Sequence, residues 1–321
     1  MPTRIVSIIV ITYNAKDDLK ECLQSLVTQD YSEIEIIVVN DASTDGTAEL
    51  VEDFIKTANS DITVVTNRTN LGVAGSRNAG IRHAKGDVIA FTDSDCVADH
   101  DWVSELVRSY ECNDVAAVGG KILDARMAGI WNVTNKGHDF VASQEGYVPF
   151  IKGCNMSFKG DLLRGYMFND EIKYGYEELL LCDSLTDNGY KIYYNPRAVV
   201  HHKHRTSLEA LLKQKYLRGM SSVWYLRKRN MFFMYRRHFI LLLVLILLPL
   251  IIVNKLFMYP AIVLLSIFSL SLLREEIIFK EKNIIEMVVT FPFLVIIEFA
   301  HFAGACSGVA RFRILKRSVT E

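Results

Sequence analysis

The chain lacks the cysteine patterns that build disulfide or zinc frameworks. Its six cysteines, at positions 22, 96, 112, 154, 182 and 306, form no Cys-x-x-Cys pair and no zinc-ligand spacing. They are therefore expected to be reduced thiols of a cytosolic protein. No Gly-x-Gly-x-x-Gly element is present, which disfavours a dinucleotide-dependent oxidoreductase. No secretory signal is expected either, because Pro2-Thr3-Arg4 leads directly into a strand-like run.

The first 95 residues alternate between two hydrophobic patterns. Short apolar runs rich in Ile and Val indicate buried strands, and the segments between them show helical spacing. The expected strands are Ser7–Asn14, Ile34–Val39, Ile62–Val65 and Asp87–Asp93, and the expected helices cover Leu19–Leu26, Leu50–Ile55 and Gly72–Ala84. This order predicts an α/β fold with a mostly parallel sheet flanked by helices.

Acidic and amide side chains follow three of these strands. The fourth strand ends in Asp93-Ser94-Asp95, and the first two run into Asn14 and Asp41. Open α/β sheets bind ligands at the carboxyl ends of their strands. Two carboxylates so close repel each other unless a cation is present, and Mg²⁺ or Mn²⁺ prefers such oxygen ligands. The alternative is an Asp-Ser-Asp turn that caps the next helix.

Five segments together resemble the family 2 nucleotide-sugar glycosyltransferases of GT-A fold, and they span most of Met1 to His204. The segments are SIIVITYNAKDDLKECLQSL, IIVVNDASTDGT, NLGVAGSRNAGIRHAKGDVIAFTDSDC, GCNMSFKGDLL and YEELLLCDSLTDNGYKIYYNP. The resemblance implies that residues 1–95 hold the nucleotide diphosphate sugar and that residues 96–205 hold the acceptor.

The resemblance also assigns donor-side roles to matching residues. Thr12, Tyr13 and Asn14 would line the nucleoside pocket, and Asp41 would hydrogen-bond the base. Asp93, with Ser94 beside it, would contact the ribose or the metal, and Asp95 would ligate the ion that bridges the diphosphate. Arg77 would lie near the pyrophosphate or the sugar; the alternative is a residue on the surface of its helix.

A catalytic carboxylate is expected at the start of a later helix. The family usually shows Glu-Asp there, and this chain has Glu177-Glu178, so Glu178 takes the position of the general base. The alternative is a pair of first-turn acids favoured by the helix dipole. The family continues with an Asp and an Arg that are replaced here by Leu180 and Ser184, which leaves their acceptor or phosphate contacts in question.

Two further sites follow from the resemblance. Gly153 and Asn155 match an acceptor-side strand beneath the donor sugar, or else belong to an ordinary core strand. His202, near the end of the strand Ala198–His204, would complete the metal shell, or else belongs to a solvated basic loop.

The last third of the chain has a different composition. Phe239–Val253 and Leu256–Leu273 contain 15 and 18 residues without charge, and a third apolar run from Ile284 to Val309 includes Glu286, Glu298 and His301. Residues 1–205 hold 20 basic and 30 acidic side chains, whereas eight basic residues and no acid occur between Lys213 and Arg237. Such a basic collar is typical of the cytoplasmic side of a membrane anchor and attracts anionic lipids.

The expected organisation is therefore a catalytic domain over 1–205, an amphipathic basic interface region over 206–237, and membrane segments with a basic tail over 238–321. Within the interface region, Leu208–Leu226 is expected to be a helix lying at the membrane surface. Two spans are expected, followed by a third re-entrant or interfacial segment broken at Pro292. Gly304-x-x-x-Gly308 offers small residues for close helix packing. The unpatterned loop Asp124–Tyr147 is a candidate lid over the acceptor cleft.

These features predict an integral membrane protein with its catalytic domain in the cytoplasm. It would be a metal-dependent inverting glycosyltransferase that moves one sugar from a nucleotide diphosphate donor to a lipid-linked or glycan hydroxyl acceptor, without nucleic acid. Processive synthases of the family carry Gln-x-x-Arg-Trp, and Gln214-Lys215-Tyr216-Leu217-Arg218-Gly219 lacks its interval and its Trp. The alternatives are a polyprenyl-phosphate sugar synthase, whose phosphate acceptor needs no general base, and a non-catalytic membrane scaffold.

Overall fold

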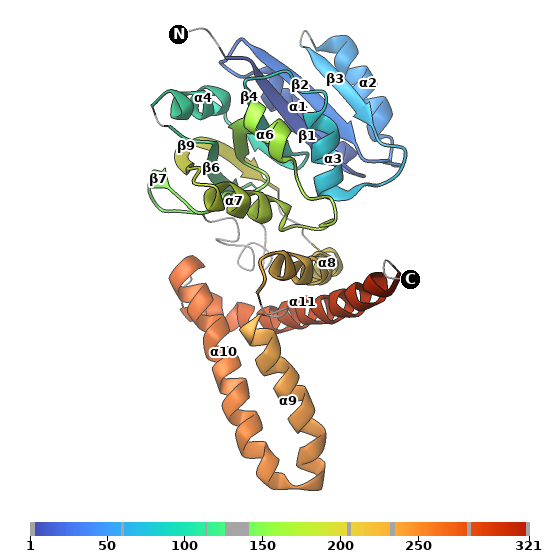
Figure 1. The fold of residues 1–321 in the computed structure, drawn as a ribbon, viewed down its shortest axis with the longest axis vertical. Coiled ribbons are helices and arrows are strands. Elements are labelled where there is room, and N and C mark those ends of the chain that lie inside the picture. The colour runs from blue at the N-terminus through green and yellow to red at the C-terminus, as the bar shows by residue number, and fades with distance from the viewer. Residues whose placement is uncertain are drawn as a thin grey trace. The chain divides into compact units, whose positions relative to one another are not determined.

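The computed structural model divides the chain into two compact units (Figure 1). One comprises Met1–Met127 with Asp139–His204, and the other comprises Ala128–His138 with Arg205–Glu321. The structure describes residues 4–58, 61–112, 114–125, 141–203, 207–231, 235–280 and 284–318. Most of the candidate lid over Asp124–Tyr147 lies outside the described residues.

Four parallel strands form the N-terminal half of the sheet, as the sequence predicts. They are β1 (Val6–Thr12), β2 (Ile34–Asn40), β3 (Ile62–Thr66) and β4 (Val88–Asp93), in the order β3-β2-β1-β4. The helices between them are α1 (Lys16–Val27), α2 (Thr47–Thr57) and α3 (Gly72–Ile81). Successive side chains of a strand point to opposite faces, so strands covered on both faces need continuous apolar runs.

The C-terminal half of the sheet is mixed rather than mostly parallel. The path continues β4-β8-β6-β9-β5; β8 is antiparallel to β4 and β6, β6 is parallel to β9, and β5 is antiparallel to β9. The bounds are β5 (Cys96–Ala98), α4 (Trp102–Cys112), β6 (Ala117–Asp124), β7 (Gly146–Tyr147), β8 (Met156–Lys159), α6 (Gly160–Tyr166), α7 (Glu177–Asp187) and β9 (Ile192–His202). The antiparallel strands enter the sheet through turns and short helices, which carry no β-α-β periodicity in the sequence.

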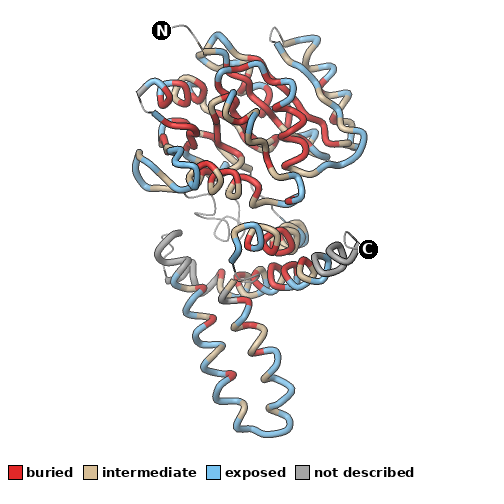
Figure 2. Tube along the Cα trace, viewed as in Figure 1, coloured by how far each residue is buried: buried red, intermediate tan, exposed pale blue. Residues whose placement is uncertain are grey.

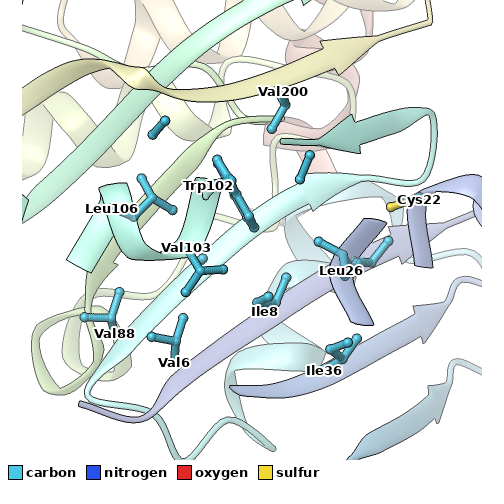
Figure 3. Close-up of a cluster of buried hydrophobic side chains, with 14 of the residues drawn as sticks. Val6, Ile8, Cys22, Leu26, Ile36, Val88, Trp102, Val103, Leu106 and Val200 are labelled. Carbon is cyan, nitrogen blue, oxygen red and sulfur yellow. The ribbon is translucent and has the colours of Figure 1, made fainter. Parts of the chain in front are cut away.

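Two apolar cores lie on the two faces of this sheet, and its central strands are largely buried (Figure 2). On one face, Trp102 of α4 lies among strand residues and the buried side of α1, and its side chain is fully buried (Figure 3). On the other face, Phe91 and Phe158 pack edge to face with Phe168, below α3, α6 and α7. These cores fix the strand ends that carry the polar residues.

The second unit consists of helices in its described part. They are α8 (Leu208–Lys228), α9 (Arg236–Val253), the short 3₁₀ helix η1 (Lys255–Phe257), α10 (Met258–Lys280) and α11 (Ile284–Ser318). Among the described residues, two segments are long and apolar enough to cross a membrane, Lys255–Arg274 and Thr290–Arg311, and the apolar stretch His238–Val253 is shorter. The predicted break at Pro292 is wrong, because α11 continues through this residue.

Glycines allow α8 and α11 to pack closely, side by side in Figure 1. A Cβ at Gly304 would overlap the carbonyl oxygen of Tyr216, and one at Gly219 would overlap that of His301. The Tyr216 hydroxyl donates to Ser307 Oγ across the same contact at 2.7 Å. The predicted small-residue packing is thus present, and the partner is α8, the helix expected at the interface.

Gly120 of β6 offers a test of the core beneath the sheet. A Cβ there would overlap the carbonyl oxygen of Ala198 and the side-chain amide of Asn155. The Ala198 oxygen belongs to the backbone, so a change of side-chain rotamer cannot relieve this overlap. Gly120→Ala is expected to destabilise the first unit by about 1–3 kcal/mol, the usual cost of overpacking. Thermal unfolding of the full chain in detergent measures this. Gly165→Ala, which meets nothing within 4 Å, is the matched control, and an equal shift in both variants contradicts the packing.

Candidate active site

The structure brings the predicted donor-side strand ends to one edge of the sheet. Thr12 pairs in register with Asn40, and Ile11 pairs with Asp93, so β1, β2 and β4 end side by side. Their parallel direction places the residues that follow each strand above the same edge. Asp41, Asp93 and the Thr12–Asn14 segment therefore share one region, as the sequence predicts.

The segment after β1 combines an exposed ring with a fixed backbone. Tyr13 is 54% exposed, whereas Thr12 is buried and its Oγ1 has no hydrogen-bond partner among the described residues. Asn14 has a positive φ of 49°, a conformation that asparagine tolerates better than most residues. Its backbone N–H donates to Ser43 Oγ at 3.0 Å, and its Oδ1 accepts from the Thr44 N–H at 2.8 Å. These bonds fix the loop after β1 to the loop after β2.

Asp41 binds the chain itself. Its Oδ1 accepts hydrogen bonds from Asn67 Nδ2 and from the Leu71 N–H, both at 2.8 Å, and its Oδ2 accepts one from the Gly72 N–H at 3.0 Å. The carboxylate thereby fixes the start of α3, where exposed N–H groups favour an acceptor. The contact with a base stays a prediction, with Oδ2 as the oxygen that retains a spare lone pair. Asn67 was not predicted, because no local pattern links it to Asp41.

Arg77 is a buried centre of charge pairing, so the alternative of a surface residue is wrong. Its side chain is 3% exposed, and its Nη1 lies 2.6 Å from Glu177 Oε1. Its Nη2 lies 3.3 Å from Asp93 Oδ1 and donates to the Gly153 carbonyl oxygen at 3.0 Å. The guanidinium also lies over the rings of Phe91 and Phe168, at 5.8 and 5.5 Å from their centroids.

Gly153 has a steric reason to be glycine. A Cβ at this position would come within 2.6 Å of Arg77 Nη2. The glycine therefore lets the guanidinium reach both carboxylates while its own carbonyl accepts a hydrogen bond. Gly153 contacts Arg77 rather than presenting a side chain to a sugar, and its acceptor-side role stays a prediction.

Glu177 and Glu178 begin α7, and both are buried. Arg77 compensates the charge of Glu177 directly. Glu178 is 7% exposed, and its Oε2 has no hydrogen-bond partner among the residues that the structure describes. A buried carboxylate oxygen without a partner is costly unless a ligand group occupies it. The helix dipole lowers the cost of a negative charge in the first turn of a helix. The alternative of two first-turn acids favoured by this dipole therefore accounts for part of their stability.

The acidic tip after β4 lies between Arg77 and a histidine. Burial raises the pKa of Asp93, the Arg77 guanidinium opposes this, and Asp95 raises it further. Asp95 Oδ2 lies 3.6 Å from His202 Nε2, because Cys96 of β5 pairs in register with His202 of β9. Ser94 between the two acids is 8% exposed. The predicted set Asp93, Asp95 and His202 is thus close together.

The donor set fits a divalent cation. Ligand atoms of Asp95, Cys96 and His202 lie within 4.8 Å of one another. A hydrogen bond with Cys154 lowers the pKa of Cys96, but burial and the charges of Asp95 and Asp93 outweigh it and raise that pKa to about 11. Hard ions such as Mg²⁺ and Mn²⁺ prefer the carboxylate oxygens and the imidazole to a thiol. Oxygen with one imidazole suits Mn²⁺ and is compatible with Mg²⁺.

Lys203 fixes the histidine strand beside the tip. Its backbone N–H donates to the Asp95 carbonyl oxygen at 2.9 Å, and its ammonium pairs with Asp18 at 3.2 Å and Glu21 at 2.7 Å on α1. Sequence reasoning missed this residue, since nothing local connects the end of β9 with α1.

Asn155 is a core residue in this structure, which favours the alternative of an ordinary core strand; its acceptor-side role stays a prediction. Its side chain is fully buried. Its Oδ1 accepts from Trp102 Nε1, and its Nδ2 donates to the carbonyl oxygens of Lys121 and Ala198, each at 2.9 Å. Both amide hydrogens are therefore engaged in joining β6, β9 and α4.

Comparisons with known proteins agree with this architecture. Residues 7–171, just over half of the chain, match the family model described as "Glycosyl transferase family 2". The chain is 29% identical over 239 residues to the glucosyl-dolichyl phosphate glucuronosyltransferase of Haloferax volcanii. This match covers 67% of this chain and 75% of that protein. It is also 29% identical over 209 residues to a poly-beta-1,6-N-acetyl-D-glucosamine synthase of Staphylococcus epidermidis. That match covers 60% of this chain and 48% of the synthase. The match thus spans less than half of that synthase.

Solved structures show the same fold. A mannosyltransferase from Pyrobaculum calidifontis, in complex with GDP-Man and Mn²⁺, has a TM-score of 0.63 at 20% identity and covers 95% of this chain and 87% of its own. GalNAc-T7 with UDP, GalNAc and Mn²⁺ has a TM-score of 0.55 at 16% identity and covers 64% of this chain and 44% of its own. The predicted GT-A fold is confirmed.

Asp93 links the site to the stability of the first unit. A carboxyl whose pKa is raised on folding contributes stability below its unfolded pKa of about 3.9, and this contribution is lost as the pH rises through the folded pKa. At pH 7.5 without added metal, Asp93→Asn is therefore expected to unfold at a higher temperature than the wild type. The difference shrinks as the pH is lowered toward 4. Melting curves across this pH range measure it, and a variant less stable at pH 7.5 contradicts it.

Proposed function

Because the chain belongs to glycosyl transferase family 2 and is a glycosyltransferase of GT-A fold, we propose that it is a metal-dependent inverting enzyme. It moves one sugar from a nucleotide diphosphate donor to a hydroxyl of a lipid-linked acceptor. The observation that carries this proposal is the buried Arg77, which pairs with Asp93 of the acidic tip and with Glu177, the neighbour of Glu178. One side chain thus couples the donor-side acids to the expected base.

The donor occupies the edge formed by β1, β2 and β4. The exposed Tyr13 ring and the buried Thr12 hydroxyl line the nucleoside pocket. Asp41 orders the loop before α3 and offers Oδ2 to the base. Asp93 faces the ribose or the ion, with Arg77 limiting the repulsion between the two acids of the tip.

A divalent ion held by Asp95 and His202, with Asp93 beside them, would supply Lewis-acid stabilisation of the departing diphosphate. The chain's own contribution is to hold this donor set in place before the donor arrives. Lys203 fixes the histidine strand through Asp18 and Glu21, and the Asp95 carbonyl accepts from the Lys203 N–H. Such preorganisation avoids rearrangement at the moment of reaction.

Glu178 acts as the general base. Its carboxylate takes the proton of the acceptor hydroxyl while that oxygen forms a bond to the anomeric carbon. The bond from this carbon to the diphosphate oxygen breaks, and its electron pair leaves with the diphosphate. Attack from the face opposite to the leaving group inverts the anomeric centre. The partner-free Oε2 supports this role because it is a buried acceptor in need of a hydrogen-bond donor.

The second unit anchors the enzyme in the membrane with the catalytic unit in the cytoplasm. The segment Lys255–Arg274, which comprises η1 and most of α10, is apolar, and only 17% of it is buried within the protein. Exposed apolar surface of this extent needs a lipid or protein partner. Basic residues of α8, including Lys213, Arg227 and Lys228, would face anionic headgroups on the cytoplasmic side. A relative named as a glucosyl-dolichyl phosphate glucuronosyltransferase supports a lipid-linked acceptor.

Glu178→Gln separates a hydroxyl acceptor from a phosphate acceptor. A hydroxyl needs a base, so the variant is expected to lose about 10²–10⁴-fold in turnover, the usual contribution of general base catalysis. Donor affinity, measured by calorimetry with Mn²⁺, should remain within about threefold of the wild type. Asp187→Asn, at the other end of α7, is the matched control. Full turnover in Glu178→Gln would instead favour transfer to a polyprenyl phosphate.

The neighbouring histidines of β9 provide a paired test of the metal set. His202 faces Asp95, whereas His201 Nε2 lies 3.0 Å from Asp99. His202→Gln is expected to raise the Mn²⁺ concentration for half-maximal activity by about tenfold or more, and His201→Gln should leave it unchanged. Titration of donor-sugar transfer with Mn²⁺ measures both. Equal effects of the two substitutions would remove His202 from the metal set, and no transfer or hydrolysis with any donor and metal would favour a scaffold.

A further inference from the structure

The helical unit contains a buried cluster of three metal-ligating side chains. His238 is near the start of α9, and Glu298 and His301 lie one turn apart on α11. Their exposed fractions are 0%, 6% and 7%. The spacing of three residues places Glu298 and His301 on the same helix face, toward His238. Ionisable groups in such apolar helices are costly, so their burial together calls for a specific interaction.

The geometry around His238 is unusual for hydrogen bonding alone. Its Nε2 lies 3.0 Å from Glu298 Oε1 and also 3.0 Å from His301 Nδ1. An imidazole nitrogen has one in-plane direction, in which it either donates a proton or accepts one. It therefore cannot form well-aligned hydrogen bonds to both neighbours at once. Three donor atoms that converge in this way indicate a common cation.

The distances agree with such a cation. Donors that bind one ion at about 2.1 Å lie about 3.0 Å from one another in octahedral geometry and about 3.4 Å in tetrahedral geometry. The ligand atoms of His238, Glu298 and His301 all lie within 4.8 Å of one another. Two imidazoles and one carboxylate are the protein ligands of several zinc enzymes and of mononuclear iron sites, which keep further positions open for water or a ligand.

We propose that His238, Glu298 and His301 bind one divalent first-row transition metal, such as Zn²⁺ or Fe²⁺, that joins α9 to α11. The ion compensates the buried Glu298 carboxylate and occupies the direction that the two histidines share. Aromatic rings surround the cluster: Tyr235 and Phe302 lie 5.7 and 5.8 Å from the His238 ring, centroid to centroid. Such a shell restricts water and strengthens metal binding. This site shares no residue with the acidic tip of the first unit, and it does not rest on the proposed function.

Metal content of the full-length protein tests the site. The protein is purified in detergent without a polyhistidine tag, loaded with Zn²⁺, passed over a chelating resin, and analysed by mass spectrometry of its metals. About one equivalent of tightly held metal is expected in the wild type. The retained metal should fall at least about tenfold in Glu298→Gln and in His301→Gln. Asp95→Asn, in the acidic tip, and His100→Gln, an exposed histidine, should retain it.

A second measurement decides the matter if the variants do not fold. Co²⁺ added to the wild type and to Asp95→Asn should give the same visible ligand-field absorption, and Zn²⁺ should abolish it in both. A wild type that keeps no metal and gives no such absorption overturns the proposal and leaves a hydrogen-bonded contact between α9 and α11. Retention of the metal by Glu298→Gln and His301→Gln in folded form overturns it as well.

Discussion

The arrangement of the first unit depends on one buried cation between two carboxylates. Arg77 pairs with Glu177 at 2.6 Å and with Asp93 at 3.3 Å, and the side chains of Arg77 and Glu177 are both 3% exposed. Without the guanidinium, the first-turn acids of α7 and the acids after β4 would repel one another across the site. Removal of the guanidinium would cost several kcal/mol, because its carboxylate partners would be left uncompensated. The small residue at Gly153 and the rings of Phe91 and Phe168 hold the guanidinium in place.

Much of the first unit could be predicted from sequence because its signals are local. The strands β1, β2 and β4 are mostly apolar runs, and the polar residues that follow them predict a common edge once the sheet is parallel. In the remaining sheet, strands were expected near Asn155 and at Ala198–His204, but the mixed pairing was not predicted, since β5, β7 and β8 span only two to four residues and join by antiparallel pairing. Strands this short carry little periodicity.

Contacts between distant residues explain most of the differences at the site. Asn155 matches a family segment, yet its amide is used up by Trp102, Lys121 and Ala198, which no sequence pattern connects. In the sequence, Arg77 could equally be a residue on the surface of its helix. Only the structure places Glu177, a hundred positions later, beside it. In the second unit, the sequence indicated only that Glu298 and His301 would be costly to expose to lipid. The structure shows that His238 shares their burial.

We propose that the acidic tip after β4 holds a cation and that this cation in turn holds a diphosphate. A crystal structure with Mn²⁺ and a non-hydrolysable nucleotide diphosphate sugar, recorded at the manganese absorption edge, measures this directly. We expect an anomalous peak at about 2.2 Å from an Asp95 oxygen and His202 Nε2, bridging to the diphosphate, with the anomeric carbon facing Glu178. A diphosphate bound elsewhere, with no peak beside Asp95, would contradict it.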